Sequence, residues 1–98
     1  MDDALTPLRD KLDEIDAALL HAIRRRLEIC AQVAVVKADR GIQMMQPHRV
    51  DTVVSRARTY GAEHGVGPDF LEQLYRTIIA ETCRLEDEII ATTGGGHR

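Results

Sequence analysis

The longest hydrophobic pattern in the chain runs from Leu5 to about Arg40. No proline follows Pro7 within it, and the first glycine is Gly41. Its apolar residues recur at intervals of three and four, the spacing of one helix face. They are Leu5, Leu8, Leu12, Ile15, Leu19, Ile23, Leu27, Cys30 and Val33. This pattern predicts an α-helix of roughly 50 Å, because each residue adds about 1.5 Å.

Two shorter helical patterns follow. Pro47 begins a second predicted helix that ends at His64, and Pro68 opens a third that runs to about Ala91. The apolar side of the second helix comprises Val50, Val53, Val54, Ala57 and Tyr60. The stripe of the third comprises Leu71, Leu74, Tyr75, Ile78, Ile79, Thr82, Leu85 and Ile89.

The three patterns predict an all-α fold in a single domain over residues 1–98. We expect residues 5–91 to be ordered and residues 92–98, with three consecutive glycines, to form a flexible tail. The third helix is too short to cover the first, so a single chain would leave much of the long stripe in water. We therefore expect a homodimer in which the long helices cover each other. The alternative is a monomeric three-helix bundle with a bent first helix.

Two cations interrupt the long apolar stripe. At about 100° per residue the stripe centres near Leu19, and Arg26 and Lys37 project within roughly 20° of that centre. They are about 16 Å of helix rise apart. Because an unpaired buried cation is costly, this face should meet carboxylates from the protein or from a ligand.

Other polar residues share the apolar faces. Arg9 lies on the shoulder of the first stripe, Arg49 flanks the second, and Thr82 and Glu86 lie on the third. One interpretation is an internal salt-bridge network with Glu86 or Asp16 as the anion. The cations outnumber the obvious buried anions, however. A small dicarboxylate would balance them, because arginine offers two parallel donors to each carboxylate.

Composition narrows the function classes. The net charge of −3 argues against nucleic-acid and anionic-membrane binding. No signal peptide or apolar run of membrane length is present, so we expect a cytoplasmic protein. The histidines and cysteines lack metal-ligand spacing, and no glycine-rich phosphate loop precedes a helix. We therefore expect no metal and no cofactor, and a reaction that needs only charge stabilisation and conformational restraint.

The order and spacing of these residues resemble the all-helical chorismate mutases. The resemblance runs from about Leu5 to Ile90 and rests on four features. They are Leu8-Arg9 with Ile15-Asp16, the Arg26 to Lys37 interval, Arg49 after a short loop, and Thr82 to Glu86 on the last helix. It implies the chorismate mutase type II fold, an intertwined homodimer of three-helix chains, and a Claisen rearrangement of a small dicarboxylate.

The resemblance also implies roles for the site residues. Arg26 would hold one substrate carboxylate, and Arg9 would reach into the site from the other subunit. Lys37 would bind a carboxylate and the ether oxygen whose bond breaks. Arg49 would complete the positive wall.

On the last helix, the resemblance places Thr82 beside a carboxylate and Glu86 against the same ether oxygen. An ionised Glu86 would repel the negative charge that develops there. We therefore hypothesise that Glu86 is protonated and donates a hydrogen bond to this oxygen.

Two positions depart from the family pattern. A glutamate is common just after the second-helix arginine, and an acidic residue is common three before it, but here these positions are Val50 and Gln46. Chorismate would lose polar contacts at its carbon 4. The strings Met44-Met45-Gln46-Pro47-His48-Arg49 and Glu81-Thr82-Cys83-Arg84-Leu85-Glu86-Asp87-Glu88 are similar to a narrower group, the 4-amino-4-deoxychorismate mutases of 4-aminophenylalanine-derived antibiotic pathways.

The leading hypothesis is therefore an isomerase that converts 4-amino-4-deoxychorismate into 4-amino-4-deoxyprephenate. Three alternatives stay open: a chorismate mutase that makes prephenate, an isochorismate-pyruvate lyase, and a non-catalytic helical dimer that serves as an interaction module. Arg26 and Lys37 at the stripe centre favour an enzyme, because an interaction seam prefers apolar residues there.

Overall fold

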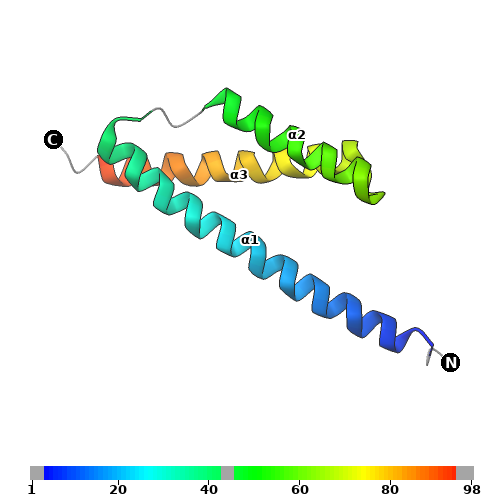
Figure 1. The fold of residues 1–98 in the computed structure, drawn as a ribbon. Coiled ribbons are helices and arrows are strands. Elements are labelled where there is room, and N and C mark those ends of the chain that lie inside the picture. The colour runs from blue at the N-terminus through cyan, green and yellow to red at the C-terminus, as the bar shows by residue number, and fades with distance from the viewer. Residues whose placement is uncertain (1–3, 43–45, 95–98) are drawn as a thin grey trace.

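The computed structural model describes residues 4–42 and 46–94. These residues form three helices: α1 (Thr6–Arg40), α2 (Pro47–His64) and α3 (Pro68–Gly94) (Figure 1). The described residues contain no strand, so the predicted all-α, three-helix architecture is confirmed. The third helix ends at Gly94, three residues after the predicted end near Ala91. Residues 95–98, and Met44 and Met45 of the connector, lie outside the described residues.

Prolines and glycines set the helix ends. Proline occupies the first turn of α1 and of α2, where its missing N–H costs no helical hydrogen bond. Gly41 (φ 66°) ends α1 and Gly65 (φ 72°) ends α2, both in the left-handed conformation that other residues adopt at a cost. The backbone N–H of Ile42 then donates to the Lys37 carbonyl at 2.9 Å, closing α1.

The helix α3 packs against both of the other helices, and the small buried core lies along it. The buried apolar residues are Ala34, Val53, Val54 and Ala57. Gly61 is also buried, and a Cβ there would stand 2.3 Å from the Val66 carbonyl oxygen. The absence of a side chain at Gly61 therefore allows the tight turn that lays α3 against α2.

The first half of α1 projects away from this core (Figure 1). Every residue from 4 to 22 is exposed, including the apolar stripe residues Leu8, Leu12, Ile15 and Leu19, which are 52–61% exposed. The chain measures 65 × 27 × 15 Å, and its radius of gyration is 17.8 Å. A compact domain of this length would have a radius near about 13 Å. We call residues 6–22 the arm.

Candidate active site

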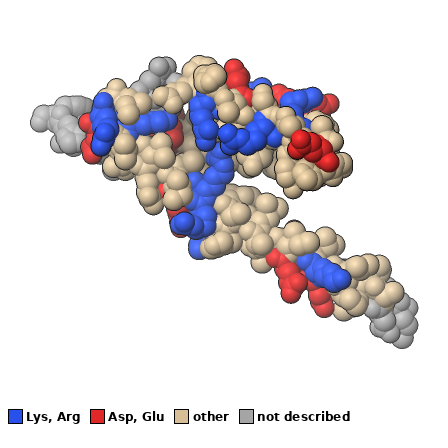
Figure 2. Space-filling view, viewed as in Figure 1, with Lys and Arg blue, Asp and Glu red and all other residues tan. Residues whose placement is uncertain are grey.

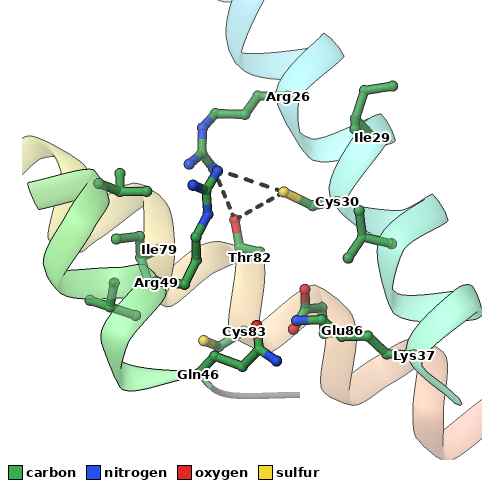
Figure 3. A pocket seen from close by; sticks show the side chains of 13 residues that line it. Arg26, Ile29, Cys30, Lys37, Gln46, Arg49, Ile79, Thr82, Cys83 and Glu86 are labelled. Atoms are coloured by element: carbon green, nitrogen blue, oxygen red, sulfur yellow. Dashed lines mark hydrogen bonds between the residues drawn. The ribbon is translucent and has the colours of Figure 1, made fainter. Parts of the chain in front are cut away.

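A cavity of about 430 Å³ lies between the second half of α1, the start of α2 and the second half of α3 (Figure 3). It gathers the site residues predicted from all three helices. Lining it are Arg26, Lys37, Gln46, Arg49, Val50, Thr82 and Glu86. The remaining predicted site residue, Arg9, is exposed on the arm and does not line the cavity of its own chain.

Helical spacing explains why these side chains meet. Arg26 and Lys37 share one wall because eleven residues are close to three turns of α1. Thr82 and Glu86 are four residues apart, so they are neighbours on one face of α3. Pro47 begins α2, so the predicted residues Gln46, Arg49 and Val50 lie together at the N-terminal end of that helix.

Arg26 is half-buried at one end of the cavity (Figure 3). Its Nη1 donates hydrogen bonds to Thr82 Oγ1 at 3.5 Å and to Cys30 Sγ at 3.8 Å. Its Cζ lies 5.8 Å from the centroid of the Tyr75 ring, within the range of a cation–π contact. No ion pair among the described residues includes Arg26.

Arg49 also lacks a carboxylate partner within the described part of the chain. Neither acid that an internal salt-bridge network would have used is paired with these arginines. Asp16 is exposed on the arm, and Glu86 forms no ion pair with Arg26 or Arg49. The cavity is therefore open, and the two guanidinium groups that line it can bind an external anion.

Lys37 and Glu86 stand at the other end of the cavity (Figure 3). Glu86 is 6% exposed and is the only buried charged side chain among the described residues. No hydrogen bond or ion pair joins its carboxyl group to another described residue. No side-chain polar atom of the described residues is buried without a hydrogen-bond partner, so the Glu86 oxygens still reach the cavity, where a ligand can meet them.

Two thiols in the cavity were not predicted as site residues. Cys30 and Cys83 are both free, half-buried and part of the lining. Burial raises the pKa of the Cys83 thiol, so Cys83 is a neutral thiol at pH 7. A sequence signal for Cys30 did exist, since it lies one helical turn after Arg26.

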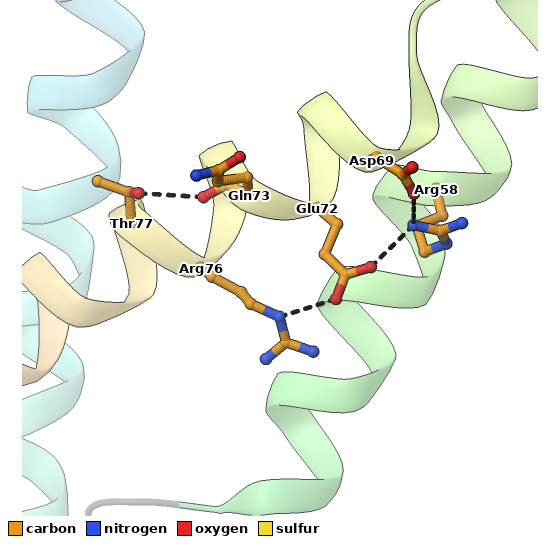
Figure 4. Close-up of polar contacts among 6 residues, drawn as sticks. All are labelled: Arg58, Asp69, Glu72, Gln73, Arg76 and Thr77. Carbon is orange, nitrogen blue, oxygen red and sulfur yellow. Dashed lines mark hydrogen bonds and ion pairs between the residues drawn. The ribbon is translucent and has the colours of Figure 1, made fainter.

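Several arginines outside the cavity are paired with acids. Arg58 Nη1 lies 2.8 Å from both Asp69 Oδ1 and Glu72 Oε1, and Arg76 Nε donates to Glu72 Oε2 at 2.8 Å (Figure 4). We call these four residues the α2–α3 clamp. In the space-filling view, Lys and Arg side chains gather where α1 crosses the α2–α3 pair (Figure 2).

The His, Cys, Asp and Glu side chains of the described residues form no group of three or more that could hold a metal ion. None of the helices in residues 4–42 and 46–94 combines the length and the apolar character needed to cross a bilayer.

The type II chorismate mutase family matches residues 8–87 of this sequence. The chain belongs to this family. The match covers most of the three helices and all of the cavity lining. It confirms the predicted resemblance and makes the chain an isomerase of the chorismate mutase class, in preference to a non-catalytic interaction module.

Proteins with similar sequences include two 4-amino-4-deoxychorismate mutases and a chorismate mutase. A 4-amino-4-deoxychorismate mutase from Streptomyces pristinaespiralis is 53% identical over 92 residues, which are 94% of this chain and 71% of that protein. A 4-amino-4-deoxychorismate mutase from Streptomyces venezuelae is 44% identical, covering 89% of this chain and 84% of its own length. A chorismate mutase from Methanocaldococcus jannaschii is 28% identical, covering 95% of this chain and 94% of its own length.

Proposed function

We propose that this chain converts 4-amino-4-deoxychorismate into 4-amino-4-deoxyprephenate by a Claisen rearrangement. The observation that carries the proposal is a cavity in which Arg26 and Arg49 have no carboxylate partner among the described residues. Such a cavity suits a dianionic substrate. The identity of 53% and 44% to two 4-amino-4-deoxychorismate mutases supports the amino form of that substrate.

In the proposed mechanism the protein supplies restraint and charge. Arg26, with Thr82 beside it, binds one carboxylate of the substrate, and Arg49 adds positive charge for the other. The substrate is thereby held in the compact conformer in which the enolpyruvyl carbon approaches the ring carbon. The rearrangement breaks the ether C–O bond and forms a C–C bond within one molecule, so no nucleophile or cofactor takes part.

Charge develops on the ether oxygen as its bond breaks. Lys37 and Glu86 stand at the same end of the cavity, and we propose that both donate a hydrogen bond to that oxygen. These donors are fixed before the reaction, and one preorganised donor of this kind is worth about 100- to 1000-fold in rate.

The start of α2 is proposed to face carbon 4 of the substrate. Gln46 and Val50 both line the cavity, and neither carries a charge. The side-chain amide oxygen of Gln46 can accept a hydrogen bond from an amine, whereas Val50 offers only an apolar surface. Both residues are assigned to substrate binding on this basis.

We further propose that the active form is an intertwined homodimer in which Arg9 enters the partner's cavity. A second copy of the chain would cover the apolar stripe of the arm, which is exposed in the single chain. The elongated shape of the chain also supports this arrangement. Arg9 lies on that arm and does not line the cavity of its own chain. A cytoplasmic location and a place in antibiotic biosynthesis stay predictions from the sequence.

A substrate comparison tests the proposed reaction. Purified protein is given 4-amino-4-deoxychorismate, chorismate and isochorismate separately, and kcat/KM is measured for each. We expect the amino compound to have the highest value. A higher value for chorismate would identify a chorismate mutase, and pyruvate release from isochorismate would identify a lyase; either result would refute the proposed substrate.

A complementation experiment tests the shared site. Arg9→Ala and Arg26→Ala chains are each expected to be nearly inactive. If they are unfolded and refolded together, one cavity of each mixed dimer regains both arginines, so about a quarter of all sites should recover. No recovery from a mixture that sediments as a dimer would show that Arg9 does not act across the interface.

A further inference from the structure

The Arg26 guanidinium is surrounded by three neutral partners. They are the Cys30 thiol at 3.8 Å, the Thr82 hydroxyl at 3.5 Å, and the Tyr75 ring with its centroid 5.8 Å from Cζ. Thr82 Oγ1 and Cys30 Sγ are themselves 3.8 Å apart, so guanidinium, thiol and hydroxyl form a closed triangle across the α1–α3 interface (Figure 3).

The available hydrogens fix the roles within this triangle. The Thr82 hydroxyl has one proton, and its contact with the Ile78 carbonyl oxygen at 3.1 Å is shorter than its contact with sulfur. Its proton is therefore used within α3, and its lone pairs accept from Arg26. The second hydrogen of Arg26 Nη1 remains for Cys30 Sγ, which is a weak acceptor.

We propose that Cys30 is a positioning residue, which holds the Arg26 guanidinium toward the cavity without neutralising it. The inference rests on the proposed function, in which Arg26 binds a substrate carboxylate. A carboxylate at position 30 would pair with Arg26 and compete with that substrate. An aliphatic side chain would leave one face of the guanidinium without a partner. A thiol orients the cation through one weak bond and leaves the other guanidinium N–H groups for an arriving carboxylate.

Steady-state kinetics with Cys30→Ala and Cys30→Ser test this role. If the contact of Arg26 with the carboxylate is the same in the ground state and the transition state, losing its orientation raises KM and leaves kcat nearly unchanged. For Cys30→Ala we expect a KM increase of about 3- to 10-fold, the range of one net hydrogen bond. Cys30→Ser keeps an acceptor and should restore KM to within about 2-fold of the wild type.

A merely structural role for Cys30 would give a different result. It would lower the active fraction and so reduce kcat at constant KM, and Cys30→Ser would not rescue it. That pattern would overturn the proposal, as would an unchanged KM in Cys30→Ala.

Alkylation of Cys30 gives a readout that needs no turnover. The rates of modification by iodoacetate and by iodoacetamide are measured on the Cys30 peptide by mass spectrometry, and their ratio is compared with that of the urea-unfolded chain. A guanidinium beside the sulfur should favour the anionic reagent by about fivefold, the factor for one unit charge near 4 Å in water. Arg26→Gln should abolish this preference.

Arg49→Gln is the matched control, since it removes an equal charge from another wall and should keep most of the preference. Equal losses in the two variants, or no preference in the folded wild type, would refute the contact between Cys30 and Arg26. If the wild type turns over none of the three test compounds, the proposed function fails, while the alkylation ratio still decides whether Cys30 holds Arg26.

Discussion

Two groups of arginines in this small protein have opposite surroundings. In the α2–α3 clamp, Arg58 and Arg76 reach carboxylate oxygens at 2.8 Å, and Glu72 accepts from both (Figure 4). In the cavity, the partners of Arg26 among the described residues are a thiol and a hydroxyl (Figure 3) and an aromatic ring. The chain thus has acids available for its arginines, but none of the described acids pairs with Arg26.

This difference separates arginines that stabilise the fold from arginines that can bind a ligand. Hydrogen bonds from Arg76 and then Arg58 hold the pKa of Glu72 below its usual value, which shows that the clamp charges stabilise one another. An arginine without such a partner destabilises the ligand-free protein. A substrate carboxylate removes this cost when it binds. The contrast predicts that removing a cavity arginine affects catalysis and removing a clamp arginine affects stability.

The largest predicted effect is that of Arg26→Ala. The substitution removes donors preorganised for the substrate, and we expect kcat/KM to fall by about 100- to 1000-fold. Because Arg26 has no ion pair among the described residues, circular dichroism and Tm should change little.

Arg58→Ala is the matched control for this variant. It removes the same type of side chain from the clamp, so we expect kcat/KM to stay within about 2-fold while Tm decreases slightly. If Arg58→Ala lost as much activity as Arg26→Ala, the proposed division between the two groups would be wrong.

The second predicted effect is that of giving Arg26 a carboxylate partner, as the clamp arginines have. Cys30→Asp places a carboxylate one turn after Arg26, where the two can pair along α1. The new anion would occupy the guanidinium and repel the substrate, so kcat/KM should fall by roughly 10- to 100-fold. Cys30→Asn, which has the same shape without the charge, should retain most of the activity; similar losses in both variants would point to shape alone.

Much of this arrangement could be predicted because it depends on local geometry. The ends of the first two helices follow from Pro7, Pro47, Gly41 and Gly65, which act through backbone constraints independent of packing. Arg26 and Lys37 were predicted to lie on one face of the first helix, because angular position along a regular helix depends only on residue number, and both line the cavity.

Contacts between helices were harder to predict from the sequence. The clamp joins Arg58 to Asp69 and Glu72, and that pairing depends on the angle of the α2–α3 turn, which Gly61 permits. The Cys30–Thr82 contact depends in the same way on how closely α1 approaches α3. Hydrophobic periodicity shows which faces are buried, but it does not show which polar atoms meet across them.

The third predicted effect compares the acids of the two regions. Glu86 is buried without an ion pair to any described residue, whereas Glu72 lies between two arginines. If Glu86 acts as a donor to the ether oxygen, Glu86→Gln keeps the shape and a donor and should retain most of kcat/KM. Glu86→Leu removes the donor and should lower kcat/KM severalfold. Equal losses in the two variants would argue against the role.

The smallest predicted effect is on the clamp itself. Because the folded pKa of Glu72 lies below the usual value of 4.5, its ion pairs stabilise the protein above about pH 4.5 and are lost as pH falls through the folded pKa. Glu72→Gln should therefore lower Tm slightly at pH 7, and its Tm should converge with that of the wild type in acid. Asp69→Asn is the matched control: Asp69 contacts Arg58 but is 96% exposed, so its effect should be smaller and more readily screened by salt. A Tm difference for Glu72→Gln that persisted undiminished in acid would mean that its charge is not what joins α2 to α3.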